Sequence, residues 1–175
     1  MGWRLTICLL LAPLSLVAQS SGTATATLSV SISAIGKVSV PASVSLLTSG
    51  AMFSPYTGTL VVSHRVRTDV GGSAAITVST SSEFSPASGP TVASGALTYT
   101  CSGASAGTPC SGSRTLSRSL QTPVLNLGSA FCTGGGGSCS STDPNTVTLG
   151  FTLTNNPGYH TGNYAAQLTF SISAV

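Results

Sequence analysis

Residues 24–34 read ATATLSVSISA, an unbroken alternation of apolar and hydroxylated side chains. Successive side chains of an extended strand point to opposite faces, so this period of two places Leu28, Val30 and Ile32 on one face and the serines on the other. The same pattern recurs later in the chain. It predicts further strands at residues 60–66, 76–80, 147–153 and 164–174, and shorter ones at 38–40, 44–47, 96–100 and 123–127.

Turn-forming residues separate these segments, and no segment has the period of a helix. Examples are Gly71-Gly72, Asp143-Pro144-Asn145 and Asn156-Pro157-Gly158. Short strands at close spacing predict an all-β protein. We expect an antiparallel immunoglobulin-like or jelly-roll β-sandwich of about 7–9 strands.

The composition supports an ordered β protein. Hydrophobic residues make up 41% of the 175 residues and charged residues only 5%, against roughly 25% charged in an average domain. Such a chain excludes charge-driven disorder and disfavours a coiled coil. The cations beyond the N-terminal region do not cluster in the sequence, so we expect no nucleic-acid partner; they are Lys37, Arg65, Arg67, Arg114 and Arg118.

The N-terminal region has the pattern of a secretory signal peptide. Arg4 precedes an apolar stretch at residues 5–17, and Ala18-Gln19-Ser20 supplies small residues for cleavage. No later stretch is long enough for a membrane-spanning helix. We therefore expect a signal peptide at 1–20, a single β-sandwich domain at 21–175, no integral membrane segment after cleavage, and a secreted protein that is extracellular, at the cell surface or periplasmic.

Four cysteines remain once Cys8, within the predicted signal peptide, is removed. An even number in a secreted chain indicates two disulfides, for which three connectivities exist. Short spacing favours the local pairs Cys101–Cys110 and Cys132–Cys139, each closing a loop. No spacing matches a zinc site, so we expect neither a metal nor a cofactor.

No residue pattern indicates catalysis. Residues 103–107 read GASAG, which matches the G-x-S-x-G nucleophile motif, but a chain rich in glycine and serine produces this match by chance and lacks the helix that the motif requires. His64 alternates with valines and is predicted to be a satisfied core or rim residue, and His160 to lie in a loop. The carboxylates Asp69, Glu83 and Asp143 are too few and too scattered for a glycosidase pair. We expect no enzymatic activity.

The C-terminal strand resembles a known family. Gly162-Asn163-Tyr164, followed by Phe170, Ile172 and Val175 in alternation, resembles the final G-x-Y strand of secreted bacterial β-sandwich subunits of the pilin and spore-coat-U type. The resemblance implies that an alternating N-terminal strand completes the sheet of a neighbouring subunit, a case of β-strand addition. The implied function is a cell-surface structural or interaction subunit, with other copies of itself or other cell-surface proteins as partners.

Residues 23–35 have the character of such a strand, with Leu28, Val30 and Ile32 as the side chains that would be buried. They lack the lysine or proline that normally protects a strand edge. A terminal strand that completes its own sheet would have the same sequence, so both arrangements stay open. Residues 28–35, LSVSISAI, also match residues 168–175, LTFSISAV, at five of eight positions. This match has two explanations. Any two alternating strands rich in serine and threonine resemble each other in sequence, or these two strands have the same environment in the fold.

A ligand- or carbohydrate-binding module is the alternative function. The only tryptophan, Trp3, lies in the predicted signal peptide. Tyr99 and Tyr164 have positions typical of structural residues. Tyr56 and Tyr159, on predicted loops, are therefore the candidate ligand contacts.

Overall fold

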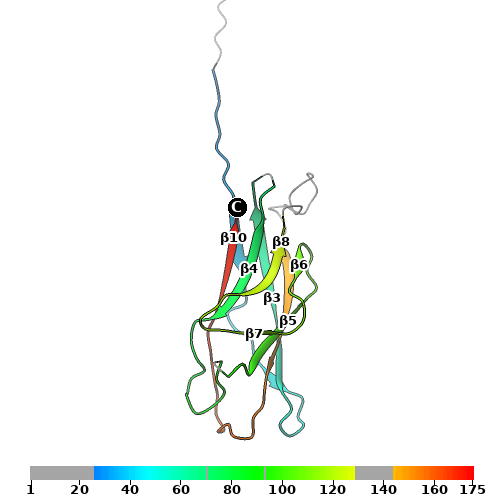
Figure 1. Ribbon diagram of the computed structural model, residues 1–175, viewed down its shortest axis with the longest axis vertical. Helices are drawn as coiled ribbons and strands as arrows, with labels where there is room; N and C mark the ends of the chain where they lie inside the picture. Colours follow the sequence, from blue (N-terminus) through cyan, green and yellow to red (C-terminus); the bar gives the residue numbers. More distant parts are fainter. Residues whose placement is uncertain (1–25, 70, 93, 129–143) are drawn as a thin grey trace, which may run out of the picture. The chain divides into compact units, whose positions relative to one another are not determined.

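The computed structural model describes residues 26–175 apart from Val70, Ala93 and residues 129–143. The chain divides into an N-terminal unit, 1–31, and a second unit, 32–175. The predicted signal peptide lies outside the described residues. Within the first unit, residues 26–31 have no secondary structure, and every described strand belongs to the second unit (Figure 1).

The described residues form strands and no helix, which confirms the all-β prediction. Accordingly, the described part of the chain contains no helix that is long and apolar enough to cross a membrane. Three strands have only two residues, which is why the count of ten exceeds the predicted 7–9. The strands are β1 (Ile35–Ser39), β2 (Leu47–Thr48), β3 (Tyr56–Arg67), β4 (Ala74–Thr80), β5 (Leu97–Ser102), β6 (Thr108–Pro109), β7 (Arg114–Thr115), β8 (Thr122–Leu127), β9 (Asn145–Leu153) and β10 (Leu168–Ala174).

The strands form two antiparallel sheets. Sheet A has the order β1-β3-β9-β5-β7, with β2 added to the far end of β3, and sheet B has the order β10-β4-β8-β6. The longest pairing joins β3 to β9, from Tyr56 opposite Leu153 to His64 opposite Asn145. In sheet B, β4 has β8 on one side and β10 on the other.

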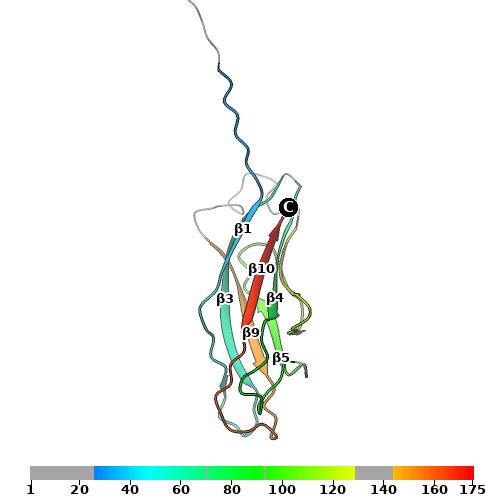
Figure 2. The same ribbon diagram turned by 90° about the vertical axis from the view of Figure 1, so that its left-hand side faces the viewer.

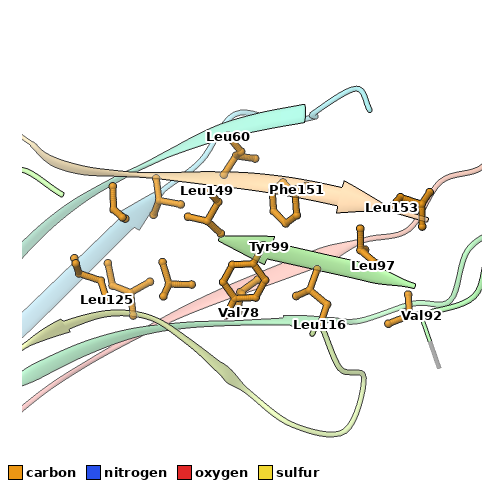
Figure 3. Close-up of a cluster of buried hydrophobic side chains, with 14 of the residues drawn as sticks. Leu60, Val78, Val92, Leu97, Tyr99, Leu116, Leu125, Leu149, Phe151 and Leu153 are labelled. Carbon is orange, nitrogen blue, oxygen red and sulfur yellow. The ribbon is translucent and has the colours of Figure 1, made fainter. Parts of the chain in front are cut away.

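One hydrophobic core receives side chains from both sheets. Val62 and Leu149 of sheet A and Ile76 and Val78 of sheet B are fully buried. Figure 3 shows Leu60, Leu149 and Phe151 on one side of this core and Val78 and Leu125 on the other. The alternation in β3, β4 and β9 therefore places side chains as predicted. The apolar side chains of each strand point into the core, and the hydroxylated side chains point away from it.

Tyr99 packs at the centre of the core. Its ring lies 6.2 Å from that of Phe151, centroid to centroid. Its hydroxyl donates a hydrogen bond of 2.7 Å to the carbonyl oxygen of Pro123, in β8 of the opposite sheet. Tyr99 is thus a structural residue, as its position in the sequence predicts.

Three predicted strands do not form as expected. Of the strand predicted at 44–47, only Leu47 lies in a strand, the two-residue β2. Residues 26–34 form no strand, although their alternation is the most regular in the chain, and β10 begins at Leu168 instead of Tyr164. Alternation determines which face of a strand is apolar, but a strand exists only where its backbone has a partner. Residues 26–34 pair with no described strand, and only Ile35 of this stretch enters β1, opposite Arg67.

Candidate functional site: an open groove beside β10

Strand β10 ends sheet B and leaves one edge open. Within the described residues its ladder of hydrogen bonds goes to β4 alone. The amide of Ser81 donates to the carbonyl oxygen of Gln167, and the amide of Val175 donates to that of Ser73. The backbone N–H and C=O groups of the odd-numbered residues of β10 therefore form the hydrogen bonds to β4. In an antiparallel ladder the even-numbered residues then point their N–H and C=O groups towards the open edge.

The side chains of those even-numbered residues face the core but are incompletely covered. Leu168, Phe170 and Ile172 are half-buried, whereas the equivalent positions of β4, such as Ile76 and Val78, are fully buried. An apolar row at the edge of a core, covered on one side only, is what remains when a sheet lacks its last strand.

A groove of about 1370 Å³ lies along this row. One wall is the connector after β1, residues 40–47, and the other is the segment 155–170 that leads into β10; Figure 2 shows the two walls as the blue trace below β1 and the brown-red trace below β10. The ends of β3 and β9 line its floor. None of the described lining residues is Lys, Arg, Asp or Glu, so the groove suits an uncharged occupant.

The groove is closed at one end, where β1 crosses β10. A Cβ atom placed on Gly36 would lie 3.0 Å from Cγ1 of Ile172, tighter than most real contacts, so the β1 backbone passes directly over this side chain. Figure 2 shows β1 and β10 side by side at this point. The free edge therefore extends from Phe170 back towards Tyr164.

The residues predicted for strand addition are strongly exposed. Leu28 is 97% exposed, Val30 80% and Ile32 64%. Residues 26–34 form no strand, whereas Ile35 begins β1; residues 23–25 lie outside the described residues. Completion of a sheet by this stretch, in its own domain or in a neighbour, stays a prediction. The free apolar segment and the open apolar groove are both features of one chain.

The two candidate ligand tyrosines line the same groove. Tyr56 is the first residue of β3, so its predicted loop position is wrong, and its ring is half-buried against the core. Tyr159 lies in the loop between β9 and β10, as predicted. Phe53 joins them from the turn after β2, where its positive φ of 57° is unusual for a bulky residue. Sequence reasoning missed Phe53, because no local pattern marks this turn.

One of the two predicted disulfides is present. Cys101 at the end of β5 is bonded to Cys110, directly after β6, so the bond connects sheet A to sheet B. Cys132 and Cys139, the other predicted pair, lie outside the described residues. No group of three or more His, Cys, Asp or Glu side chains that could hold a metal ion occurs in the described residues.

Ser105 and Glu83, two of the residues considered for catalysis, make structural hydrogen bonds. Ser105 Oγ donates to Oδ1 of Asn145 at 3.2 Å and accepts from the amide of Thr146 at 2.8 Å, so it fixes a loop to the start of β9. The carboxylate of Glu83 accepts hydrogen bonds from the amides of Phe84 and Val92 and closes a different loop. Asp143 lies outside the described residues.

His64 points into the core from β3, as its alternation predicts, and is 1% exposed. Neither ring nitrogen has a hydrogen-bond partner among the described residues of the protein. Burial lowers the pKa of His64 below its ordinary value, since the charged ring would lose its hydration. His160 is exposed in the loop before β10, as expected.

Comparison with known proteins gives no family assignment. No protein-family model matches this chain, and a search of curated proteins finds no match.

Proposed function

We propose that the protein is a secreted bacterial cell-surface subunit that assembles by β-strand addition. The observation that carries the proposal is the coexistence, in one chain, of an open apolar groove beside β10 and an exposed alternating segment of matching character. The occupant of the groove is residues 26–34 of a second copy.

The strand order supports a specific vacancy. In an immunoglobulin-like sandwich, strands A, B, E and D form one sheet, and C, F and G the other. Taken in chain order, β1-β3-β9-β5 corresponds to A-B-E-D, and β4 and β10 correspond to C and F. We therefore favour the immunoglobulin-like arrangement over the jelly roll. The vacant position is that of strand G, which lies next to F.

The chemistry of the segment matches this vacancy. An extended strand beside β10 would satisfy the outward backbone groups of Leu168 and Phe170 and place alternate side chains over the half-buried row. Burying Leu28, Val30 and Ile32 supplies about 4–9 kcal/mol of transfer free energy. An association cost of at least about 4 kcal/mol opposes it.

The test is the size of the chain lacking residues 1–20 in solution, with a matched pair of variants. We expect concentration-dependent oligomers by analytical ultracentrifugation. Val30→Asp would place a charge in the groove and should yield monomers, whereas Ser31→Asp, on the opposite face, should still assemble. Monomers at all concentrations, or equal assembly of both variants, would reject strand addition.

A ligand- or carbohydrate-binding module is the second candidate, favoured by the convergence of Tyr56, Tyr159 and Phe53 on the groove. In that case a small ligand occupies the groove instead of a strand. Tyr159→Ala would then abolish binding of a neutral oligosaccharide in calorimetry while leaving the oligomeric state unchanged.

A further inference from the structure

The outer face of sheet A carries a concentrated group of cations. Lys37 of β1 and Arg65 of β3 are directly opposite one another in the antiparallel register, and Arg67 is the next outward residue of β3. Residues directly opposite in a sheet share a face, and like charges in that position repel. Three of the five cations beyond residue 20 therefore lie together at one end of this face, although they are dispersed in the sequence.

A hollow of about 290 Å³ lies among these cations. Its lining residues are Lys37, Ser39, Ser63, His64, Arg65 and Pro144. Hydroxyl groups and cations together are suited to a carboxylate or sulfate group, which accepts hydrogen bonds from both.

Rows of hydroxyl groups extend from this hollow across sheet A. Ser63 is in register with Thr146, Val61 with Thr148 and Ser102, and Thr59 with Gly150 and Thr100. The last row runs from Thr57 through Thr152 and Thr98 to Thr115. Neighbouring strands are about 4.8 Å apart, so these hydroxyls form a regular array. From position 57 to 63 of β3, and on the outward positions of β9 and β5, no residue is charged.

We propose that this face, defined as the Lys37–Arg65–Arg67 cluster with the adjoining threonine rows, binds an acidic polysaccharide. The cations bind its anionic groups and the hydroxyl array hydrogen-bonds to its sugar hydroxyls. An anionic membrane fits less well, because the exposed large apolar residues of this face, Ile35, Leu47 and Val61, are separated along β3 at the levels of Arg67, Thr57 and position 61, whereas membrane-surface binding needs a contiguous apolar face to insert. A single-stranded nucleic acid fits less well because no aromatic ring is present in these rows for base stacking.

The site is separate from the groove, although Arg67 Nε donates a 3.0 Å hydrogen bond to the carbonyl oxygen of Ser33, at the end of the proposed donor segment. The cations lie on the outward, odd-numbered positions of β1 and β3, whereas the groove is lined by inward positions. Binding is therefore measured on the Val30→Asp variant as well as on the unmodified mature chain. Any difference in affinity between these two proteins reflects multivalency in the oligomer and not the affinity of a single site.

The experiment measures binding to polygalacturonate and to dextran sulfate at low salt, with neutral dextran as the negative probe. We expect binding to both acidic polymers that weakens as salt is added. The double variant Lys37→Ser with Arg67→Ser should weaken binding to the acidic polymers by roughly 30-fold, because each cation near an anionic surface contributes about fivefold to the affinity. Arg118→Ser, which removes an exposed cation outside the cluster, should leave it unchanged.

A second pair of variants tests the hydroxyl rows. Thr59→Val with Thr100→Val should reduce affinity for both acidic polysaccharides by severalfold without changing the dependence on salt, because no charge is removed. Inorganic polyphosphate and vesicles of anionic phospholipid are the competing probes. The proposal is overturned if the acidic polysaccharides do not bind, if Lys37→Ser with Arg67→Ser binds as well as the unmodified chain, or if polyphosphate or vesicles bind as tightly and the threonine variant binds normally.

Discussion

At the scale of single residues, His64 couples the stability of the fold to pH. Its ring is buried with both nitrogens unpartnered, and burial lowers its pKa below the ordinary 6.5. The unfolded chain therefore binds a proton more readily than the folded one as the pH falls through 6.5. The free energy of unfolding should be highest above that pH and should decline below it, by at most about 1.4 kcal/mol per pH unit for this group.

The measurement is urea unfolding at pH 7.5 and 5.0. His64→Leu should lose this part of the pH dependence and should gain about 1 kcal/mol or more at pH 7.5, because two unsatisfied buried nitrogens are removed. His160→Asn, at an exposed position, is the control and should keep the wild-type dependence. An identical pH dependence in the His64→Leu variant would assign the effect to other groups.

The same residue shows what a sequence reveals at this scale. Alternation with Val62 and Val66 was sufficient to place His64 inside, because the facing of a side chain is local. The lack of hydrogen-bond partners for its ring nitrogens could not be predicted, since such partners depend on which atoms β1 and β9 bring opposite the ring. For the same reason, the clustering of Lys37 with Arg65 follows from the register of β1 on β3, which the sequence does not state.

At the scale of elements, the Cys101–Cys110 disulfide holds the two sheets together at β5 and β6. It closes a loop with a sequence separation of nine residues, which in the chain-entropy account contributes about 2.5 kcal/mol by restricting the unfolded chain. Replacing both cysteines by alanine should lower the free energy of unfolding by about that amount in urea titrations. The far-UV circular dichroism should stay unchanged, since the strands themselves remain. An unaltered unfolding midpoint would mean that the disulfide contributes nothing to stability.

Strands with the same sequence pattern have different outcomes in this molecule. Residues 28–35 and 168–175 share five of eight identities, yet the latter form β10 and residues 28–34 form no strand. The difference is the partner, because residues 168–174 pair with β4 whereas residues 28–34 pair with no strand of their own chain among the described residues. Sequence alternation therefore predicted most strands and their buried faces, but not which of two similar segments would be left unpaired.

At the scale of the whole molecule, removing residues 1–31 tests whether the second unit folds without the N-terminal segment. Leu28 and Val30 are strongly exposed, so their loss removes no buried surface from the monomer. The shortened chain should unfold at the same urea concentration as the monomeric Val30→Asp variant of the longer chain. It should also fail to oligomerise, because it has lost Leu28 and Val30 of its donor segment but kept its groove. Unfolding or aggregation of the shortened chain would show instead that residues 1–31 cover the core.

The empty groove of the shortened chain should accept the missing segment as a peptide. A peptide of residues 23–35 should raise the free energy of unfolding of this chain with the logarithm of the peptide concentration, by about 2.7 kcal/mol at one hundred times its dissociation constant. The same peptide with Val30→Asp should have no effect, because its apolar face then carries a charge into a groove whose described lining holds no countercharge. A peptide with Ser31→Asp should act like the unmodified one, since position 31 would face solvent. If all three peptides leave thermal unfolding unchanged, the groove is not a strand acceptor, and the convergence of Tyr56, Tyr159 and Phe53 on it would then favour the small-ligand alternative.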